Sequence, residues 1–170
     1  MDRRLLTGAG FLVVAVLVTL AILFGTGLAY ELAAPDEYDR TTVTVRDANG
    51  TRLATVEARV ADSFAARYVG LSDTDSLPDG EGMLFVHGGE GEQTYVMRGM
   101  SFPLDIVFIG AEGRITTIHH APTPEETPES DLRRYSGRAK WVLEVPRGWT
   151  NATGVDEGDR IDTPPVAAAS

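Results

Sequence analysis

The stretch YVMRGMSFPLDIVFIG, residues 95–110, decides the fold, because one strand breaks off within it and a second strand begins. Two methionines flank an arginine and a glycine, and Pro103 then restricts the backbone just before a strongly apolar run. Arg98 and Asp105 stand on the two sides of this turn. Because a charge beside a buried strand is costly unless it is paired, these residues indicate either a binding site or polar anchors of the turn.

Short segments that alternate apolar and polar residues continue the strand pattern on both sides of this stretch. Asn49-Gly50 supplies the turn of a hairpin, and the glycine-rich residues 88–93 predict a second turn. The predicted strands are residues 42–46, 52–60, 82–88, 94–98, 104–110, 114–121, 139–146 and 157–161. The pattern predicts a mostly β (α+β) fold, a small barrel-like domain or a sandwich of seven or eight short strands.

One or two short helices complete the predicted domain. In residues 62–70, Ser63 or the aspartate before it is a candidate N-cap, and a glycine ends the helix. The spacing places Phe64, Ala65, Tyr68 and Val69 on one helical face. Residues 147–155 have room for a further helical turn.

The N-terminal residues 5–30 carry no charge and predict a single transmembrane helix. At about 1.5 Å per residue the helix is roughly 39 Å long, enough to cross a hydrocarbon core of about 30 Å. Arg3 and Arg4 precede the run and acidic residues follow it, so the N-terminus is expected in the cytoplasm and the rest of the chain outside. The expected organisation is an anchor in residues 1–30, an acidic tether in 31–40, the β domain in 41–162 and a disordered tail in 163–170.

Cleavage of residues 1–30 as a signal peptide, followed by secretion, is the alternative, although the apolar run exceeds the usual 7–15 residues of such a peptide. The sequence has no cysteine. Disulfides, thiolate metal ligands and lipid attachment through an N-terminal cysteine are therefore excluded.

The chain is acidic, with 25 Asp and Glu against 15 Lys and Arg and a net charge of −10. Such a charge repels nucleic acid, so we expect no nucleic-acid partner. Lys140 is the only lysine, and this composition resembles that of proteins from salt-loving archaea. In that setting the acidic residues form a solvated surface rather than a binding site for basic partners.

No motif of a known catalytic mechanism is present in the sequence. His119 and His120 are the most visible metal candidates, but adjacent strand residues point to opposite faces, which disfavours one shared ion. His87 is a further ligand candidate with no spacing to support it. We therefore assign no catalytic residues, no metal site and no cofactor. Asn49 and Asn151 match the N-x-[ST] glycosylation pattern, and an external domain makes both eligible.

A scattered polar set lies in or beside apolar segments and comprises Arg67, Arg98, Asp105 and Glu144. Arg98 and Asp105 would pair across their turn, and Glu144 would then need Arg67 or Arg98 as its cation. A structural ion network and a small-ligand pocket are both compatible with this set.

Four motifs in order resemble a known family: RYVGLS, GMLFVH, YVMRGMSFPLDIVFIG and AKWVLEVPRGW with the Gly-Asp that follows. The family is the one called domain of unknown function 192, and the resemblance covers about residues 41–162. It implies a small barrel-like β domain, often exported or membrane-attached, without an established activity. The chain differs at Gly99-Met100, where the family usually has Asn-Thr, and at Val96, where it has a tryptophan.

The leading functional expectation is a membrane-anchored extracytoplasmic module that binds a small ligand or acts as an accessory protein, without catalysis. The candidate binding residues are Arg67, Met97, Arg98, Asp105 and Glu144. The expected partners are the lipid bilayer, through the N-terminal helix, and an unknown small ligand or envelope protein. A metal-dependent or hydrolytic envelope enzyme and a structural protein-interaction module are the alternatives.

Overall fold

The structure, a computed structural model, describes residues 16–23, 25, 29, 37–125 and 127–162. Residues 16–23 are helical. Among the described residues, no helix is long and apolar enough to cross a membrane. Much of the expected anchor in residues 5–30, most of the tether and all of the tail at 163–170 lie outside the described residues.

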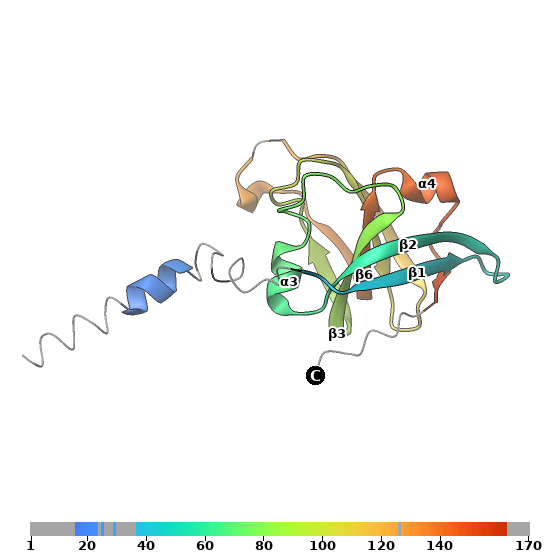
Figure 1. The fold of residues 1–170 in the computed structure, drawn as a ribbon, viewed down its shortest axis with the longest axis horizontal. Coiled ribbons are helices and arrows are strands. Elements are labelled where there is room, and N and C mark those ends of the chain that lie inside the picture. Colours follow the sequence, from blue (N-terminus) through green and yellow to red (C-terminus); the bar gives the residue numbers. More distant parts are fainter. Residues whose placement is uncertain (1–15, 24, 26–28, 30–36, 126, 163–170) are drawn as a thin grey trace, which may run out of the picture.

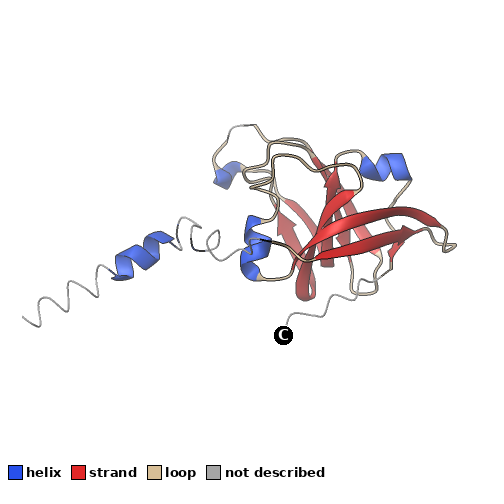
Figure 2. Cartoon of the chain, viewed as in Figure 1, coloured by secondary structure: helices blue, strands red, loops and turns tan. Residues whose placement is uncertain are grey.

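Seven strands form one curled sheet, a half-barrel, in the order β5-β4-β6-β3-β2-β1-β7 (Figures 1 and 2). The strands are β1 (Arg40–Arg46), β2 (Arg52–Ala61), β3 (Glu81–Tyr95), β4 (Leu104–Ile109), β5 (Ile115–Ala121), β6 (Tyr135–Pro146) and β7 (Arg160–Ile161). The predicted β-rich class and strand number are thereby confirmed. Only β2 and β3 pair in parallel among the described strands; the other pairs are antiparallel.

The prediction of a turn in residues 88–93 is wrong, because β3 runs without interruption through that segment. β6 pairs with β3 on both sides of the glycines, and the register shifts between Val86 and Gly91. The glycine-rich segment therefore takes up an irregularity in a long bent strand, as β-bulges do, instead of reversing the chain.

Two hydrophobic cores lie on the two faces of the sheet, because neighbouring strand residues point to opposite faces. All seven strands contribute to the inner core, which includes Val43, Val56, Leu84, Val107, Ile115, Leu143 and Ile161. The outer core includes Ala66, Leu71, Met83, Phe85, Leu104, Ile106, Phe108 and Val142. β4, which lies between β5 and β6, is buried along its whole length.

The open edge of the half-barrel at β5 is covered by the segment that leads into β7. The Ile115 amide donates to the Asp159 carbonyl at 2.8 Å, and the Ile161 amide donates to the Gly113 carbonyl at 2.8 Å. Further along the edge, the Glu157 carboxylate accepts a hydrogen bond of 2.9 Å from the Ile118 amide. These contacts satisfy part of the edge that a β-sheet would otherwise leave unpaired.

Three short helices accompany the sheet: α3 (Phe64–Val69), η1 (Glu129–Asp131) and α4 (Trp149–Thr153). The prediction of Ser63 as N-cap of α3 is confirmed, since its hydroxyl accepts from the Ala66 amide at 3.1 Å. The predicted buried face is wrong in part. Val69 is buried as predicted, but Phe64 is 61% exposed, and Ala66, which lies outside the predicted face, is buried in its place. Figure 1 shows α3 and α4 on different sides of the curled sheet.

Candidate functional site

A pocket of about 260 Å³ opens on the outer face, between α3 and the bent part of β3. We call it the outer pocket. Its walls combine aromatic, aliphatic, cationic and carboxyl side chains. The lining includes Arg67, Tyr68, Leu71, Phe85, His87, Gln93, Tyr95, Arg98, Met100, Leu104 and Glu144.

Glu144 contributes a carboxyl group to this pocket from the centre of β6. In the sheet it lies between Met83 of β3 and Ile106 of β4, and both neighbours are fully buried. Glu144 itself is 6% exposed. Among the described residues, no hydrogen bond or ion pair reaches its carboxyl group. Burial without a partner raises the pKa of Glu144 to about 8, so its carboxyl is protonated at pH 7.

Arg67 reaches the pocket from α3 and is held by the backbone. Its Nη1 donates to the Asp62 carbonyl and, at 2.8 Å, to the Val86 carbonyl. These bonds anchor one side of the guanidinium group against β3. The predicted ion pair of Glu144 with Arg67 or Arg98 is absent among the described residues, so Arg67 stands in the pocket as a charge without a carboxylate partner there.

Arg98 approaches the pocket from the turn after β3. Its guanidinium carbon lies 3.9 Å from the centre of the Tyr68 ring, in a cation–π contact. Nη2 donates to the Tyr68 carbonyl, and Nη1 lies 3.3 Å from the carboxylate of Glu129. Arg98 also lines a second pocket, of about 250 Å³, together with Met97 and Gly99. Arg98 therefore forms a wall between two depressions.

His87 and Tyr95 form a hydrogen-bonded pair in the outer pocket. The His87 Nε2 lies 2.9 Å from the Tyr95 hydroxyl. Burial, and then the Arg67 charge, lower the pKa of His87 to about 4, so the imidazole is neutral at pH 7. Burial and the nearby Glu144 raise the pKa of Tyr95. The Tyr95 ring packs edge-on against Phe85, with centroids 5.1 Å apart, and this contact fixes the hydroxyl.

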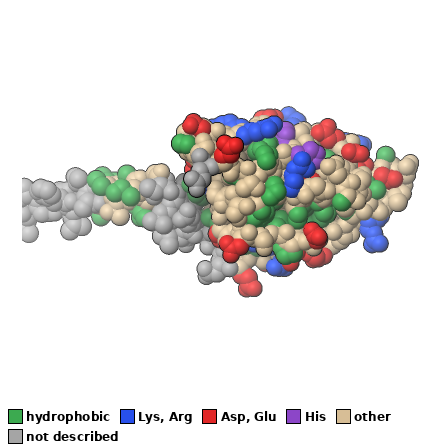
Figure 3. All heavy atoms as spheres, turned by 90° about the horizontal axis from the view of Figure 1, so that it is seen from above, with side chains coloured by type: hydrophobic (Ala, Val, Ile, Leu, Met, Phe, Trp, Pro, Cys, Tyr) green, Lys and Arg blue, Asp and Glu red, His purple; other side chains and the backbone are tan. Residues whose placement is uncertain are grey.

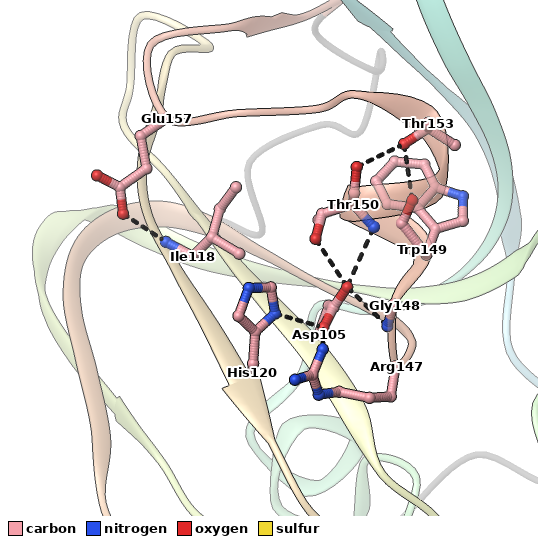
Figure 4. A network of polar contacts seen from close by, with 9 residues as sticks. All are labelled: Asp105, Ile118, His120, Arg147, Gly148, Trp149, Thr150, Thr153 and Glu157. Carbon is pink, nitrogen blue, oxygen red and sulfur yellow. Dashed lines mark hydrogen bonds and ion pairs between the residues drawn. The ribbon is translucent and has the colours of Figure 1, made fainter.

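Asp105 lies on the inner face, in a polar network away from the outer pocket (Figure 4). Its side chain is fully buried and accepts five hydrogen bonds. The donors are His120 Nδ1 at 2.7 Å, Arg147 Nη1 at 3.2 Å, the amides of Gly148 and Thr150 at 3.1 Å, and the Thr150 hydroxyl at 2.8 Å. Asp105 thus holds the start of α4 against the sheet.

The pKa of Asp105 reflects this complete pairing. Burial raises it, but the hydrogen bonds from His120 and Thr150 outweigh burial and leave the pKa below its usual value. The expected pair of Arg98 with Asp105 is wrong. The partners of Asp105 are His120 and Arg147, because the register of β4 and β6 places Asp105 beside Val145 on the inner face.

The structure brings together three of the five candidate binding residues, namely Arg67, Arg98 and Glu144. Met97 is buried in the outer core and lines only the second pocket among those described. Asp105 belongs to the network on the other face. The candidate set therefore divides into a pocket and a structural anchor.

His119 and His120 point to opposite faces of β5, as strand alternation predicts. His119 Nε2 lies 2.8 Å from the Ser136 carbonyl and its ring contacts Phe108 at 5.5 Å, whereas His120 binds Asp105. Among the described residues, no group of three or more His, Cys, Asp or Glu side chains is arranged to hold a metal ion.

The unusual Gly99-Met100 pair has a structural explanation in part. Gly99 adopts a φ of +66°, a left-handed conformation that glycine and asparagine take more readily than other residues. Glycine in place of the family's asparagine is therefore compatible with the backbone conformation of this turn. Met100 lines the outer pocket, so an apolar side chain stands where the family usually has threonine.

Asn49 and Asn151 are both exposed. Asn49 lies in the turn between β1 and β2, where the Asp47 carboxylate accepts its backbone amide at 2.9 Å. Asn151 lies in α4. Glycosylation at either site stays a prediction.

Tyr95 was not predicted as a site residue, and His87 was predicted only as a candidate metal ligand. Both residues lie on β3, and an even separation of eight residues places them on one face of a strand. That signal was hidden because a turn was predicted between them.

The chain is similar to a known family and to two solved structures. The family model called DUF192, described as Uncharacterized ACR, matches residues 44–163. A protein from Sinorhizobium meliloti 1021, proposed to be a transcription regulator, is 27% identical with a TM-score of 0.67, covering 76% of this chain and 97% of its own. A protein of unknown function from Novosphingobium aromaticivorans is 29% identical with a TM-score of 0.63, and the match covers 79% of this chain and 96% of that protein.

None of the curated proteins matches this chain. The family model spans well over half of the sequence and the complete curled sheet except for the first residues of β1. The resemblance derived from the four motifs is therefore confirmed, and the chain belongs to the DUF192 family.

Proposed function

We propose that this domain is a non-catalytic module that binds a small ligand in the outer pocket. The observation that carries the proposal is Glu144, a buried carboxyl group that borders the pocket and has no partner among the described residues. An unsatisfied buried polar group costs about 1–3 kcal/mol. A ligand that hydrogen-bonds to Glu144 would remove that cost.

The contrast with Asp105 supports this interpretation. Asp105 is a structural carboxylate, and each of its oxygens accepts hydrogen bonds from side chains or amides of the fold. Glu144, in the neighbouring strand, is also buried but has no such support among the described residues. The same fold thus satisfies one buried carboxyl group and leaves the other beside a pocket.

The serine and threonine hydroxyl groups that line the pocket do not favour the enzyme alternative. The Ser72 hydroxyl donates to the Val69 carbonyl at 2.6 Å, and the Thr94 hydroxyl lies 2.8 Å from that of Ser136. Neither contacts His87, so neither has the base that nucleophilic catalysis needs.

We propose no role in transcription for this chain, although such a role is proposed for the S. meliloti protein. A net charge of −10 opposes contact with the phosphate backbone. On the face shown in Figure 3, acidic and basic side chains are interspersed and form no extended basic surface.

We further propose that residues 5–30 anchor the domain to the outer side of the cell membrane. The support is the uncharged run itself, with arginines before it and acidic residues after it. Protease added to intact cells should then remove the domain, and a protected domain would contradict this topology.

Binding in the outer pocket is tested by NMR with a library of small neutral, anionic and cationic compounds on the full chain. Gln93→Trp places an indole at a lining position of the pocket. Glu92→Trp is the matched control, because its side chain is exposed on the opposite face of the same strand.

We expect at least one compound class to shift resonances of the pocket residues. Gln93→Trp should abolish these shifts and Glu92→Trp should leave them unchanged. Shifts confined to other surfaces, or equal loss in both variants, would refute the proposal and favour the structural interaction module.

A further inference from the structure

The outer pocket carries a local positive charge within a strongly acidic protein. Its charged lining residues are Arg67, Arg98 and Glu144. Glu144 is neutral at pH 7 because burial raises its pKa to about 8, and His87 is neutral because burial and Arg67 lower its pKa to about 4. Arg98 is paired with Glu129, whereas Arg67 has no carboxylate partner among the described residues. The remaining charge matches a single anion.

The pocket also contains hydrogen-bond donors without acceptors. An arginine has five N–H groups, and the bonds of Arg67 to Asp62 and Val86 involve Nη1 alone. Its Nε and Nη2 have no acceptor among the described residues. The protonated Glu144 adds an O–H group to the lining of the same pocket. A ligand that supplies acceptor oxygens would satisfy both side chains.

The size and the walls of the pocket limit the rest of the ligand. Because a cavity of about 150 Å³ admits benzene, a pocket of about 260 Å³ has room for a ligand with a single ring and a small polar group. The apolar side chains of the lining include Leu71, Phe85, Met100 and Leu104. An inorganic anion would leave these walls without contacts, whereas a short hydrocarbon or aromatic group would cover them.

We propose that the ligand is a small organic acid, bound as its carboxylate between Arg67 and the protonated Glu144, with its apolar part against Leu71 and Met100. This inference rests on the proposed binding function and names its ligand class. The carboxylate accepts charge-assisted hydrogen bonds from the guanidinium group and an O–H hydrogen bond from Glu144. Loss of the Glu144 proton would place two like charges together and expel the ligand.

Binding should therefore weaken as the pH rises past the pKa of Glu144. The titratable and charged groups that share the pocket with it are Arg67 and Tyr68 from α3, His87 and Tyr95 from β3, and Arg98 from the turn. The pKa of His87 is lowered to about 4 and that of Tyr95 is raised, so neither changes its charge between pH 7 and pH 9. Arginine also keeps its charge in this range.

The test is an NMR titration of the full chain at pH 7 and pH 9. The probes are benzoate, its neutral analogue benzamide, its cationic analogue benzylamine, and inorganic phosphate. Glu144→Gln keeps the shape and one donor but has no proton to lose. Glu92→Gln, at an exposed position of β3, is the matched control.

We expect benzoate to bind about tenfold more weakly at pH 9 than at pH 7. This is the dependence expected if binding requires the proton of Glu144, whose pKa is about 8. Glu144→Gln should bind benzoate equally at both pH values, and Glu92→Gln should behave like the parent chain.

The other possible outcomes refute different parts of the inference and can be told apart. Preference for benzamide, benzylamine or phosphate in the outer pocket would refute the carboxylate ligand and leave the proposed binding function intact. A pH effect that persists in Glu144→Gln would refute the role of its proton. Failure of all four probes and of the compound library would refute the binding function itself.

Discussion

Replacing Glu144 by glutamine should stabilise the protein at alkaline pH and have little effect at acidic pH. In the folded state the carboxyl group is 6% exposed, and burial raises its pKa to about 8 from the ordinary 4.5. Between these two values the folded chain holds a proton that the unfolded chain has released. Unfolding therefore releases this proton, so its stabilising effect is complete below pH 4.5 and decreases as the pH rises to 8.

The magnitude follows from the two pKa values. The window is 8 − 4.5 = 3.5 pH units, and each unit corresponds to about 1.4 kcal/mol, which gives about 5 kcal/mol in total. Between pH 5 and pH 8 the difference in unfolding free energy between Glu144→Gln and the parent chain should grow by about 3–4 kcal/mol. The large size of this effect results from the absence of any partner for the carboxyl group among the described residues.

The assay is urea unfolding of the full chain at pH 5, 6, 7 and 8 and constant ionic strength, followed by tryptophan fluorescence. Glu92→Gln is the matched control, and its stability relative to the parent chain should not change with pH, because the side chain is exposed. A constant difference between Glu144→Gln and the parent chain across these pH values would refute the reasoning, since Glu144 would then be ionised or paired in the folded state.

Three further substitutions test the remaining contacts by thermal or urea unfolding. Asp105→Asn should lower the unfolding free energy by about 3–5 kcal/mol at pH 7, because an amide N–H would face the donors of the network. Since those donors lower the pKa of Asp105 below its ordinary 3.8, this loss of stability should shrink as the pH falls below that value. A loss of less than about 1 kcal/mol at pH 7 would contradict the network. Ser63→Ala should cost about 1 kcal/mol through loss of the cap on the Ala66 amide, and an unchanged stability would contradict the cap. Arg98→Ala should cost only about 1 kcal/mol, because its partner Glu129 is 59% exposed; a loss of 3 kcal/mol or more would indicate a buried ion pair.

Local features of the fold could be predicted from the sequence. Asn49-Gly50 marks the hairpin of β1 and β2, and the pattern of Ser63 followed by Gly70 marks the two ends of α3. These features depend on neighbouring residues in the chain, so turn and cap chemistry suffices to find them. Long-range features, such as the parallel pairing of β2 with β3, leave no comparable local signal.

The candidate site was predictable only in part. Arg67, Arg98 and Glu144 were identified as charges beside buried strands, and the structure places them around one pocket. Asp105 was grouped with them because it is close in sequence to Arg98. Asp105 is separated from the outer pocket by the register of β4 against β6. This register pairs Ile106 with Glu144 and turns Asp105 to the inner face. No residue pattern in the sequence specifies that register.

Glu144 and Asp105 show how one sheet creates opposite environments for the same chemical group. Asp105 has a lowered pKa because donors converge on it, and Glu144 has a raised pKa because it is buried without a hydrogen-bond partner among the described residues. A carboxyl group that stays protonated at pH 7 and borders a pocket is poised to donate a hydrogen bond to a carboxylate.

The most direct test of the account is the pKa of Glu144, measured from the carboxyl carbon resonance in an NMR titration of the full chain with and without benzoate. We predict a pKa of about 8 in the free protein and a higher value when benzoate is bound. A pKa near 4.5, or a value that benzoate lowers, would contradict the account.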